Sequence, residues 1–309
     1  MNNLQIGLLD LGHRENKNSL ATFQQILDYA CAADTLHFSR FWLAEHHNTN
    51  PFAPYTNPEI IITLIAAMTE HIRIGAAGIL LNLYEPYHIA TTFKLLNNLY
   101  NNRIDLGLAK GIPSNHFTKT LINNEGPRNF HSKLDELYNY FQNEDNLIKE
   151  KQILIPPFRG IVPDLWYLTN SYKNFPIVID TKSNLCRSIM HGSQSLELEY
   201  EKETLLKQKE IYFKKHGIYP KISLALAIIL DTDLRKAEKK NTALNTLNNS
   251  ESSFITAIPC TYKSLYNLLH DFQDKYGIDE FILYDMESNN NKKIKNIEQI
   301  SRIMNLQNI

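Results

Sequence analysis

The sequence predicts an α/β fold in which eight parallel strands close into a (β/α)8 TIM barrel. Eight short apolar runs of strand length recur along the 309 residues, and segments with helical periodicity stand between most of them. Parallel strands need crossover connections of this kind, and eight such units favour a closed barrel over an open doubly wound sheet. No flexible linker interrupts the pattern, so we expect one domain over residues 1–309.

The first third of the chain predicts four strands, at residues 4–9, 41–44, 72–81 and 103–109. Ser19 is a candidate cap for the helix after the first strand, and the buried face of that helix is predicted to begin at Leu20. Asn57, Pro58 and Glu59 supply a cap, a first-turn proline and an acid for the next helix. Five apolar residues are predicted to form its buried face: Ile60, Ile61, Leu64, Ile65 and Met68.

The rest of the chain predicts four more strands, at residues 165–168, 185–190, 222–230 and 281–284. A long charged helix is predicted at about residues 196–215, and its charges indicate a face that contacts solvent. The asparagine-rich segment 241–249 is predicted to be a surface turn.

Composition and charge argue against several classes of protein. The formal net charge of −1 gives no general attraction to nucleic acid or to an anionic membrane. No apolar run is long enough to cross a bilayer, and the first residues lack the pattern of a signal peptide. Cys31, Cys186 and Cys260 are odd in number, far apart and without metal-ligand spacing. We therefore expect reduced, mostly buried thiols in a soluble cytoplasmic protein.

Functional residues of a parallel barrel gather where its strands end at their carboxyl ends. The predicted strand ends carry a cation, amide and hydroxyl groups, and backbone with little or no side chain. This mixture suits a phosphate attached to a flat aromatic ring system. The candidate residues, from the second to the fifth strand, are His46, Ala77, Gly78, Lys110, Asn170 and Ser171.

Each candidate also has a structural interpretation. Glu45, His46 and His47 could suggest a metal, but adjacent residues of a strand face opposite sides and the helical H-E-x-x-H spacing is missing. We expect no metal site. Lys110 could pair with an acid, and the Asn170–Ser171 pair could cap a helix. The sequence contains neither a glycine-rich dinucleotide fingerprint nor a P-loop, which disfavours nicotinamide and nucleoside triphosphate ligands.

Three segments within residues 40–111 occur in a characteristic order: FWLAEHHN, LIAAMTEHIRIGAAGILL and YEPYHIATTFKLLNNLYNNRIDLGLAKG. They strongly resemble the bacterial-luciferase-like flavin-dependent monooxygenase family, in its compact single-chain branch. PPFRGIVPDLWYLTNS is similar to a further segment of that family. The resemblance implies a luciferase-like barrel that uses reduced FMN, delivered by a separate flavin reductase. It implies that dioxygen forms a flavin hydroperoxide, which oxidises a small organic substrate, and that the protein is a homodimer that pairs through the helices beside the second and third strands.

The resemblance also gives the candidate residues their roles. His46 matches the active-site histidine of the family, a candidate acid or base. The Ala77–Gly78 bond matches a non-proline cis peptide behind the flavin ring. Lys110 takes the place of an arginine near the phosphate, and Asn170–Ser171 takes the place of two serines that bind it.

Two departures from the family pattern concern the phosphate. Lys110 keeps the charge of arginine but loses its bidentate fork, and LTNS stands where the family has LGSS. Residues 175–180, FPIVID, offer an alternative fifth strand, with Asp180, Thr181 and Ser183 as phosphate contacts; we prefer the LTNS placement because it keeps the spacing to the sixth strand.

Two alternative functions remain open at this point. One is hydride transfer with a deazaflavin, and the other is a non-catalytic flavin-binding or partner subunit. Substrate selectivity is expected to depend on loops 13–18, 50–55 and 112–120.

Overall fold

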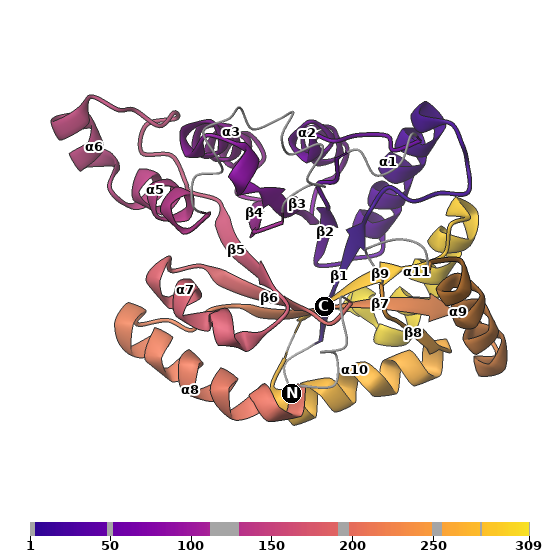
Figure 1. Ribbon diagram of the computed structural model, residues 1–309. Helices are drawn as coiled ribbons and strands as arrows, with labels where there is room; N and C mark the ends of the chain where they lie inside the picture. Colours follow the sequence, from indigo (N-terminus) through magenta and orange to yellow (C-terminus); the bar gives the residue numbers. More distant parts are fainter. Residues whose placement is uncertain are drawn as a thin grey trace.

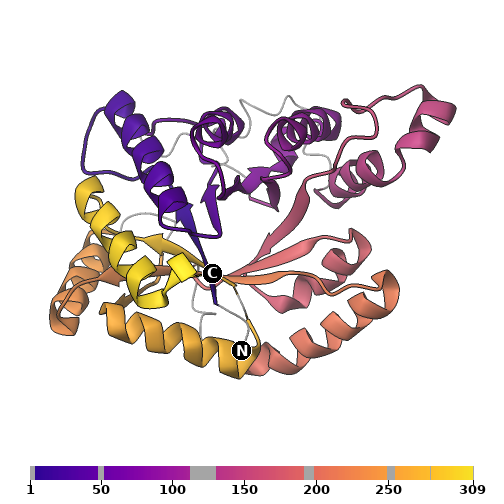
Figure 2. The same cartoon turned by 180° about the vertical axis from the view of Figure 1, so that it is seen from behind.

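The computed structural model describes residues 4–47, 52–111, 130–190, 198–248, 255–278 and 280–308. Eight parallel strands form a closed ring, because β6 pairs with β7 as well as with β5. Helices surround the strands in both views of the molecule (Figures 1 and 2). The predicted (β/α)8 barrel is therefore confirmed.

All eight predicted strands are present, with ends that differ from the prediction by at most two residues. In chain order they are β1 (Gln5–Asp10), β2 (Arg40–Leu43), β3 (Arg73–Leu80), β4 (Ile104–Ala109), β5 (Asp164–Thr169), β6 (Asn184–Ser188), β7 (Ile222–Leu230) and β9 (Glu280–Asp285).

A ninth strand, β8 (Ala257–Cys260), was not predicted. It pairs with residues 227–230 of β7, on the edge opposite to β9, which also pairs with Ala227 and Ile228. The N–H of Thr256 donates to Met190 O at 2.8 Å, so β8 continues the line of β6 beyond the end of that strand. This extra strand lengthens the barrel wall at its carboxyl end.

The helices between the strands follow the predicted order. They are α1 (Ser19–Thr35), α2 (Pro58–Met68), α3 (Pro86–Leu99), α5 (Phe130–Gln142), α6 (Glu144–Lys151), α7 (Phe175–Asp180), α8 (Leu198–His216), α9 (Leu234–Asn248), α10 (Tyr262–Tyr276) and α11 (Asn290–Met304). Because residues 175–180 are helical, the alternative fifth strand is wrong. The predicted turn at 241–249 is also wrong, since α9 continues through residue 248.

Two details of the first helices differ from the prediction. Asn18, rather than Ser19, caps α1: its side chain accepts from Ala21 N at 3.0 Å. Leu20 is 81% exposed, so it does not begin a buried face. Of the predicted face, Ile61 and Ile65 are buried, whereas Ile60, Leu64 and Met68 are exposed; the other buried residues of α2 are Pro58, Ile62 and Ala66. Nearly every residue of α2 is apolar, so hydrophobic periodicity could not identify its buried side.

The amino ends of the strands enclose a buried ion-pair network. Asp105 accepts from Arg40 Nη1 at 2.5 Å, from Arg73 Nη2 at 2.7 Å and from Trp42 Nε1 at 3.0 Å. Burial alone would raise the pKa of Asp105, but the two guanidinium groups hold it below its ordinary value. Arg40 also lies over the Trp166 ring, 4.5 Å from its centroid. This end of the barrel is therefore filled by structural contacts, and the opposite end remains for a ligand.

The carboxyl end of α2 is held by two side chains from neighbouring elements. Asp34 of α1 accepts from three consecutive backbone N–H groups, those of residues 70–72, at 2.8, 3.0 and 2.7 Å. Arg103 donates to the carbonyl oxygens of Ala66, Thr69 and Ile72 at 2.8–2.9 Å. The bond to Ala66 O satisfies a carbonyl that the end of the helix leaves unpaired, and the other bonds fix the residues that follow it.

Candidate active site

Four partly buried apolar side chains lie on top of the barrel interior, at the carboxyl ends of its strands. Leu11 follows β1, Ala77 is in the last half of β3, Leu168 is in β5 and Met286 follows β9. They pack on the buried residues inside the barrel, among them Trp42 and Trp166. We call these four residues, which share one buried cluster beneath them, the barrel-mouth platform.

The backbone of β3 is irregular beside this platform. The peptide bond between Ala77 and Gly78 is cis, which is the conformation that the resemblance implies. The pairing of β3 with β4 shifts between Ala76 and Ile79. At Gly107, across from this shift, a Cβ would lie 2.1 Å from Ala76 O, so only glycine permits the close approach of the two strands.

A buried carboxylate follows β2. Glu45 is 2% exposed, and its oxygens lie 2.5 Å from His47 Nε2, 2.6 Å from the Tyr84 hydroxyl and 2.9 Å from Leu80 N. Burial and the bond to Glu45 raise the pKa of the Tyr84 hydroxyl above its ordinary value. Glu45 therefore joins His47 to the end of β3.

His46 lines a pocket beside the platform. The pocket is a shallow depression with a cavity volume of only about 10 Å³, and His13 and Tyr55 also line it. Its other lining residues are small or apolar: Leu11, Gly12, Ala44, Ala53 and Pro54. Two of the loops that we expected to determine selectivity thus contribute to the pocket. The third, 112–120, lies outside the described residues.

Beneath the pocket, the loop after β1 is held by a buried ion pair. Asp10 is fully buried, and its Oδ2 lies 2.7 Å from Arg14 Nη2. Burial alone would raise the pKa of Asp10, but Arg14 and Lys293 lower it below its ordinary value. His13 Nδ1 lies 3.0 Å from the buried Tyr284 hydroxyl. The position of His13 is thus set by contacts with β9, a link that sequence spacing could not indicate.

The three predicted phosphate residues lie at the ends of β4 and β5, which are neighbouring strands. Lys110 and Asn170 are exposed. Ser171 is buried, and its hydroxyl donates to Glu201 Oε1 of α8 at 2.5 Å. Arg187 of β6 pairs with the same carboxylate, with 3.1 Å between Nη2 and Oε2. The charged helix around Glu201 was expected to face solvent, so sequence analysis missed both Glu201 and Arg187.

Other kinds of site find no support in the described residues. They contain no group of three or more metal-ligating side chains. None of the helices among them combines the length and apolarity that crossing a membrane requires. Cys186 and Cys260 are buried free thiols, and burial raises the pKa of each to about 12, whereas Cys31 is half-buried.

Sequence comparison identifies related proteins for the first half of the chain. Residues 4–143 match the model of the family described as luciferase-like monooxygenase. YwcH of Bacillus subtilis, an uncharacterised protein, is 33% identical over 161 residues, which are 51% of this chain and 48% of YwcH. The chain thus spans about half the length of the curated relatives it matches.

Structure comparison extends over nearly the whole chain. Apo-MsnO8 superimposes with a TM-score of 0.81 at 18% identity, covering 98% of this chain and 99% of MsnO8. The oxygenating constituent of 3,6-diketocamphane monooxygenase of Pseudomonas putida, solved with FMN, superimposes with a TM-score of 0.69 at 13% identity. The match covers 98% of this chain and 97% of that chain. An F420-dependent secondary alcohol dehydrogenase superimposes with a TM-score of 0.67 at 14% identity, covering 96% of this chain and 99% of the dehydrogenase.

The structural similarities establish the fold of the whole chain, and the sequence match establishes kinship over its first half. Both agree with the segments that first indicated the resemblance. Over residues 4–143, this chain is similar to the luciferase-like monooxygenase family.

Proposed function

We propose that this protein is a flavin-dependent monooxygenase that uses reduced FMN and dioxygen to oxidise a small organic substrate. The observation that carries the proposal is the barrel-mouth platform, which lies beside the pocket that His46 lines, since Leu11 belongs to both. An apolar floor for a flat ring and a titratable side chain at a small pocket meet there, at the end of the barrel where catalytic residues gather. The family match over residues 4–143 supports the same reaction class.

The residues divide into a ring-binding group and a proton-transfer group. Ala77, Gly78 and the platform would hold the flavin ring, with Lys110, Asn170 and Ser171 toward its phosphate. When bound, reduced FMN supplies two electrons to dioxygen, so that one oxygen atom enters the substrate and the other leaves as water. His46 would exchange a proton with the substrate at the atom that reacts. Glu45 would act indirectly, by fixing His47 and the end of β3.

The supply of electrons implies a transient partner. The described residues contain no nicotinamide-binding fingerprint, so a separate flavin reductase would deliver the reduced flavin. The proposed site is open enough for exchange, since Lys110, Asn170 and His46 are all exposed.

A deazaflavin is the second candidate cofactor. The F420-dependent dehydrogenase has the same fold along the length of this chain, and it supports a reaction in which hydride transfer replaces oxygenation. Both cofactors present a flat ring to the platform. The two proposals differ in the role of dioxygen, which is a substrate only of the monooxygenase.

We also propose a homodimer that pairs through α2 and α3. Each helix presents an exposed apolar row at i, i+4 spacing: Ile60, Leu64 and Met68 on α2, and Leu95 and Leu99 on α3, between 40% and 62% exposed. The two helices lie next to each other on the outside of the barrel (Figure 1). Their charged residues are only Glu59 and the buried Lys94, so two copies of this face can pack without charge repulsion.

The test of the proposed function is binding and oxidation of reduced flavin. Anaerobic titration should show that the protein binds reduced FMN, and mixing with air should give a transient absorbance that free reduced FMN does not give. The same titration with reduced F420 is the comparison. Tight binding of F420 with no binding of FMN would replace the monooxygenase by a hydride-transfer enzyme. Binding of FMN without altered reaction with dioxygen would favour a non-catalytic partner subunit.

A further inference from the structure

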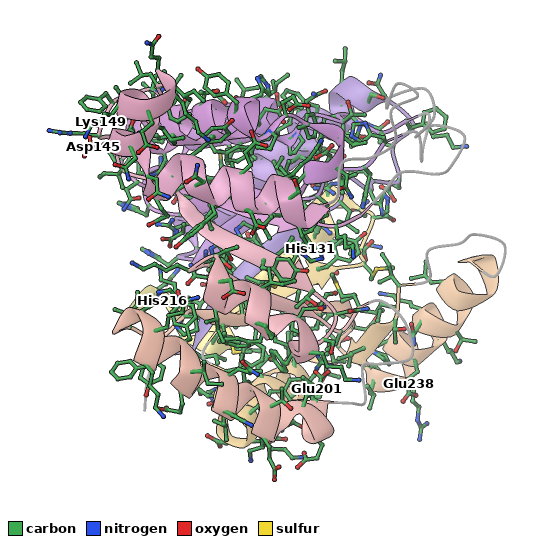
Figure 3. All side chains as sticks on the ribbon, turned by 60° about the vertical axis from the view of Figure 1, so that its left-hand side comes forward. His131, Asp145, Lys149, Glu201, His216 and Glu238 are labelled. Carbon is green, nitrogen blue, oxygen red and sulfur yellow. The ribbon has the colours of Figure 1, made fainter. Side chains whose placement is uncertain are left out.

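The loop after β5 already binds a negatively charged group of the protein itself. Glu201 Oε1 accepts from the Ser171 hydroxyl at 2.5 Å, and its Oε2 accepts from Tyr172 N at 3.1 Å. Glu201 is 5% exposed and reaches the loop from α8; its side chain is labelled in Figure 3. A hydroxyl and a backbone N–H at the end of a barrel strand are the donors that a phosphate would use, and here a carboxylate uses them.

The other backbone N–H groups of the loop, those of Ser171, Lys173 and Asn174, are occupied as well. The backbone N–H groups of residues 171–174 all donate within the protein. Ser171 N donates to Thr169 Oγ1 at 3.2 Å, Lys173 N to Ser171 Oγ at 3.2 Å, and Asn174 N to Ser171 O at 3.4 Å. A hydroxyl has one hydrogen to donate. A phosphate that used the Ser171 hydroxyl and the Tyr172 N–H would therefore have to take these two donors from Glu201.

Arg187 holds the carboxylate where it is. The guanidinium is fully buried, its Nη2 lies 3.1 Å from Glu201 Oε2, and its Nε donates to Asn170 O at 3.3 Å. Separating a buried ion pair is costly, because each charge loses its partner in a medium that solvates it poorly. Glu201 is therefore not a mobile surface side chain that an incoming ligand displaces freely.

We propose that Glu201 is a specificity-determining residue that competes with the flavin phosphate for Ser171 and Tyr172, and so lowers the affinity for FMN relative to riboflavin. The inference rests on the proposed flavin site. A carboxylate repels a phosphate dianion but leaves the contacts of an uncharged flavin ring unchanged. The protein would then hold its flavin chiefly by the ring, with Lys110 as the exposed cation at the end of β4. Such weak binding suits a flavin that is exchanged with a reductase.

The main variant is Glu201→Gln, with Glu203→Gln as its control, because Glu203 is an exposed acid on the same helix. Dissociation constants for FMN and riboflavin would be measured by quenching of flavin fluorescence. Glu201→Gln should bind FMN about tenfold more tightly, roughly the effect of one hydrogen bond to a charged group. Its affinity for riboflavin, and both affinities of Glu203→Gln, should stay within about twofold of wild type.

Inorganic phosphate tests Glu201 without a flavin. At constant ionic strength, phosphate should raise the unfolding temperature of Glu201→Gln but not that of wild type or Glu203→Gln. If phosphate stabilises Glu201→Gln alone while none of the proteins binds a flavin, the proposed function is refuted, and what remains is that Glu201 competes with phosphate for this loop. The inference is overturned if phosphate affects wild type and Glu201→Gln alike, or if the substitution does not favour FMN over riboflavin.

A variant that keeps the ion pair covers the case in which Glu201→Gln does not fold. Glu201→Asp retains the charge beside Arg187 but shortens the side chain by one methylene group, so that it reaches Ser171 and Tyr172 less well. FMN affinity should rise in the same direction, by a smaller factor. No rise relative to riboflavin would count against the competition that we propose.

Discussion

Replacing Asp105 by asparagine should destabilise the barrel strongly, because this carboxylate lies between two guanidinium groups at the amino end of the strands. The substituted amide could still accept from Trp42 Nε1, since it keeps one side-chain oxygen. Arg40, which is 3% exposed, would keep only Glu280 as an anionic partner, at 2.6 Å. Arg73 is 23% exposed on its side chain and would be left with Asp164 at 3.5 Å. We expect a loss of about 3 kcal/mol in the free energy of unfolding, the lower end of the range for removing one partner of a buried ion pair.

The matched control is Asp145→Asn, which removes an acid from another Asp–Arg pair. Asp145 and Arg159 lie 3.4 Å apart, but their side chains are 73% and 71% exposed (Asp145 is labelled in Figure 3). An exposed pair of this kind contributes less than about 1 kcal/mol. The contrast between the two variants therefore isolates the effect of burial from that of charge.

Urea unfolding followed by tryptophan fluorescence measures both variants. The chain has two tryptophans, Trp42 and Trp166, and both are buried inside the barrel with 5.1 Å between their ring centroids. The fluorescence thus reports directly on the interior beside Asp105. A loss below about 1 kcal/mol for Asp105→Asn, equal to that of Asp145→Asn, would refute the argument that this network stabilises the barrel.

Four further predictions concern pH, catalysis, the cofactor and assembly. The pKa of Asp105 is lower in the folded state than in the unfolded state, so its stabilising effect is complete above a pH of about 4 and is lost as the pH falls toward the folded pKa. In urea unfolding, the free energy of unfolding of Asp105→Asn should therefore decline less with falling pH over that range than that of wild type. His46→Ala should keep flavin binding and the unfolding temperature but lower product formation by about 10²- to 10⁴-fold, with hydrogen peroxide released instead. His47→Ala should lower the unfolding temperature first, because it removes a partner of Glu45. If the two variants have the same effects on stability and on coupling, these roles are contradicted. Lys110→Ala should weaken FMN more than riboflavin in fluorescence titrations, and equal losses would make Lys110 a structural residue. Leu64→Glu should convert a dimer to a monomer in analytical ultracentrifugation, while a wild-type protein that is monomeric at micromolar concentration would remove the basis for the proposed interface.

Sequence patterns predicted the barrel because each of its strands is a short apolar run between helices. Burial on both faces leaves little alternation in such strands, and β7 is buried along its whole length. The strand that was missed, β8, has four residues and contains Pro259, which is unusual inside a strand. It is tolerated at the edge position that β8 occupies beyond the end of β6. Short strands of this kind depend on tertiary contacts that the sequence does not display.

Helix faces and site contacts were harder to predict. In α2 the apolar residues surround most of the helix, so that Ile60 and Ile61 were indistinguishable in sequence although one is exposed and the other buried. Glu201 is one acid in a charged helix, and only the fold brings it to Ser171, thirty residues earlier. The resemblance supplied roles for His46 and Lys110 but could not show which acid lies beside the loop after β5. Contacts between distant segments determine these features, and local composition does not record them.

The bonds that hold the carboxyl end of α2 affect how the exposed apolar face of α2 and α3 could contact another molecule. Asp34 and Arg103 attach the last turn of α2 and the following residues to α1 and to the start of β4. The backbone under Leu64 and Met68 is therefore already ordered in the isolated subunit. Docking onto it would require few losses of main-chain freedom, and the entropic penalty of association would fall mainly on side-chain rotamers. Such preorganisation allows a small apolar contact to form without folding of either surface.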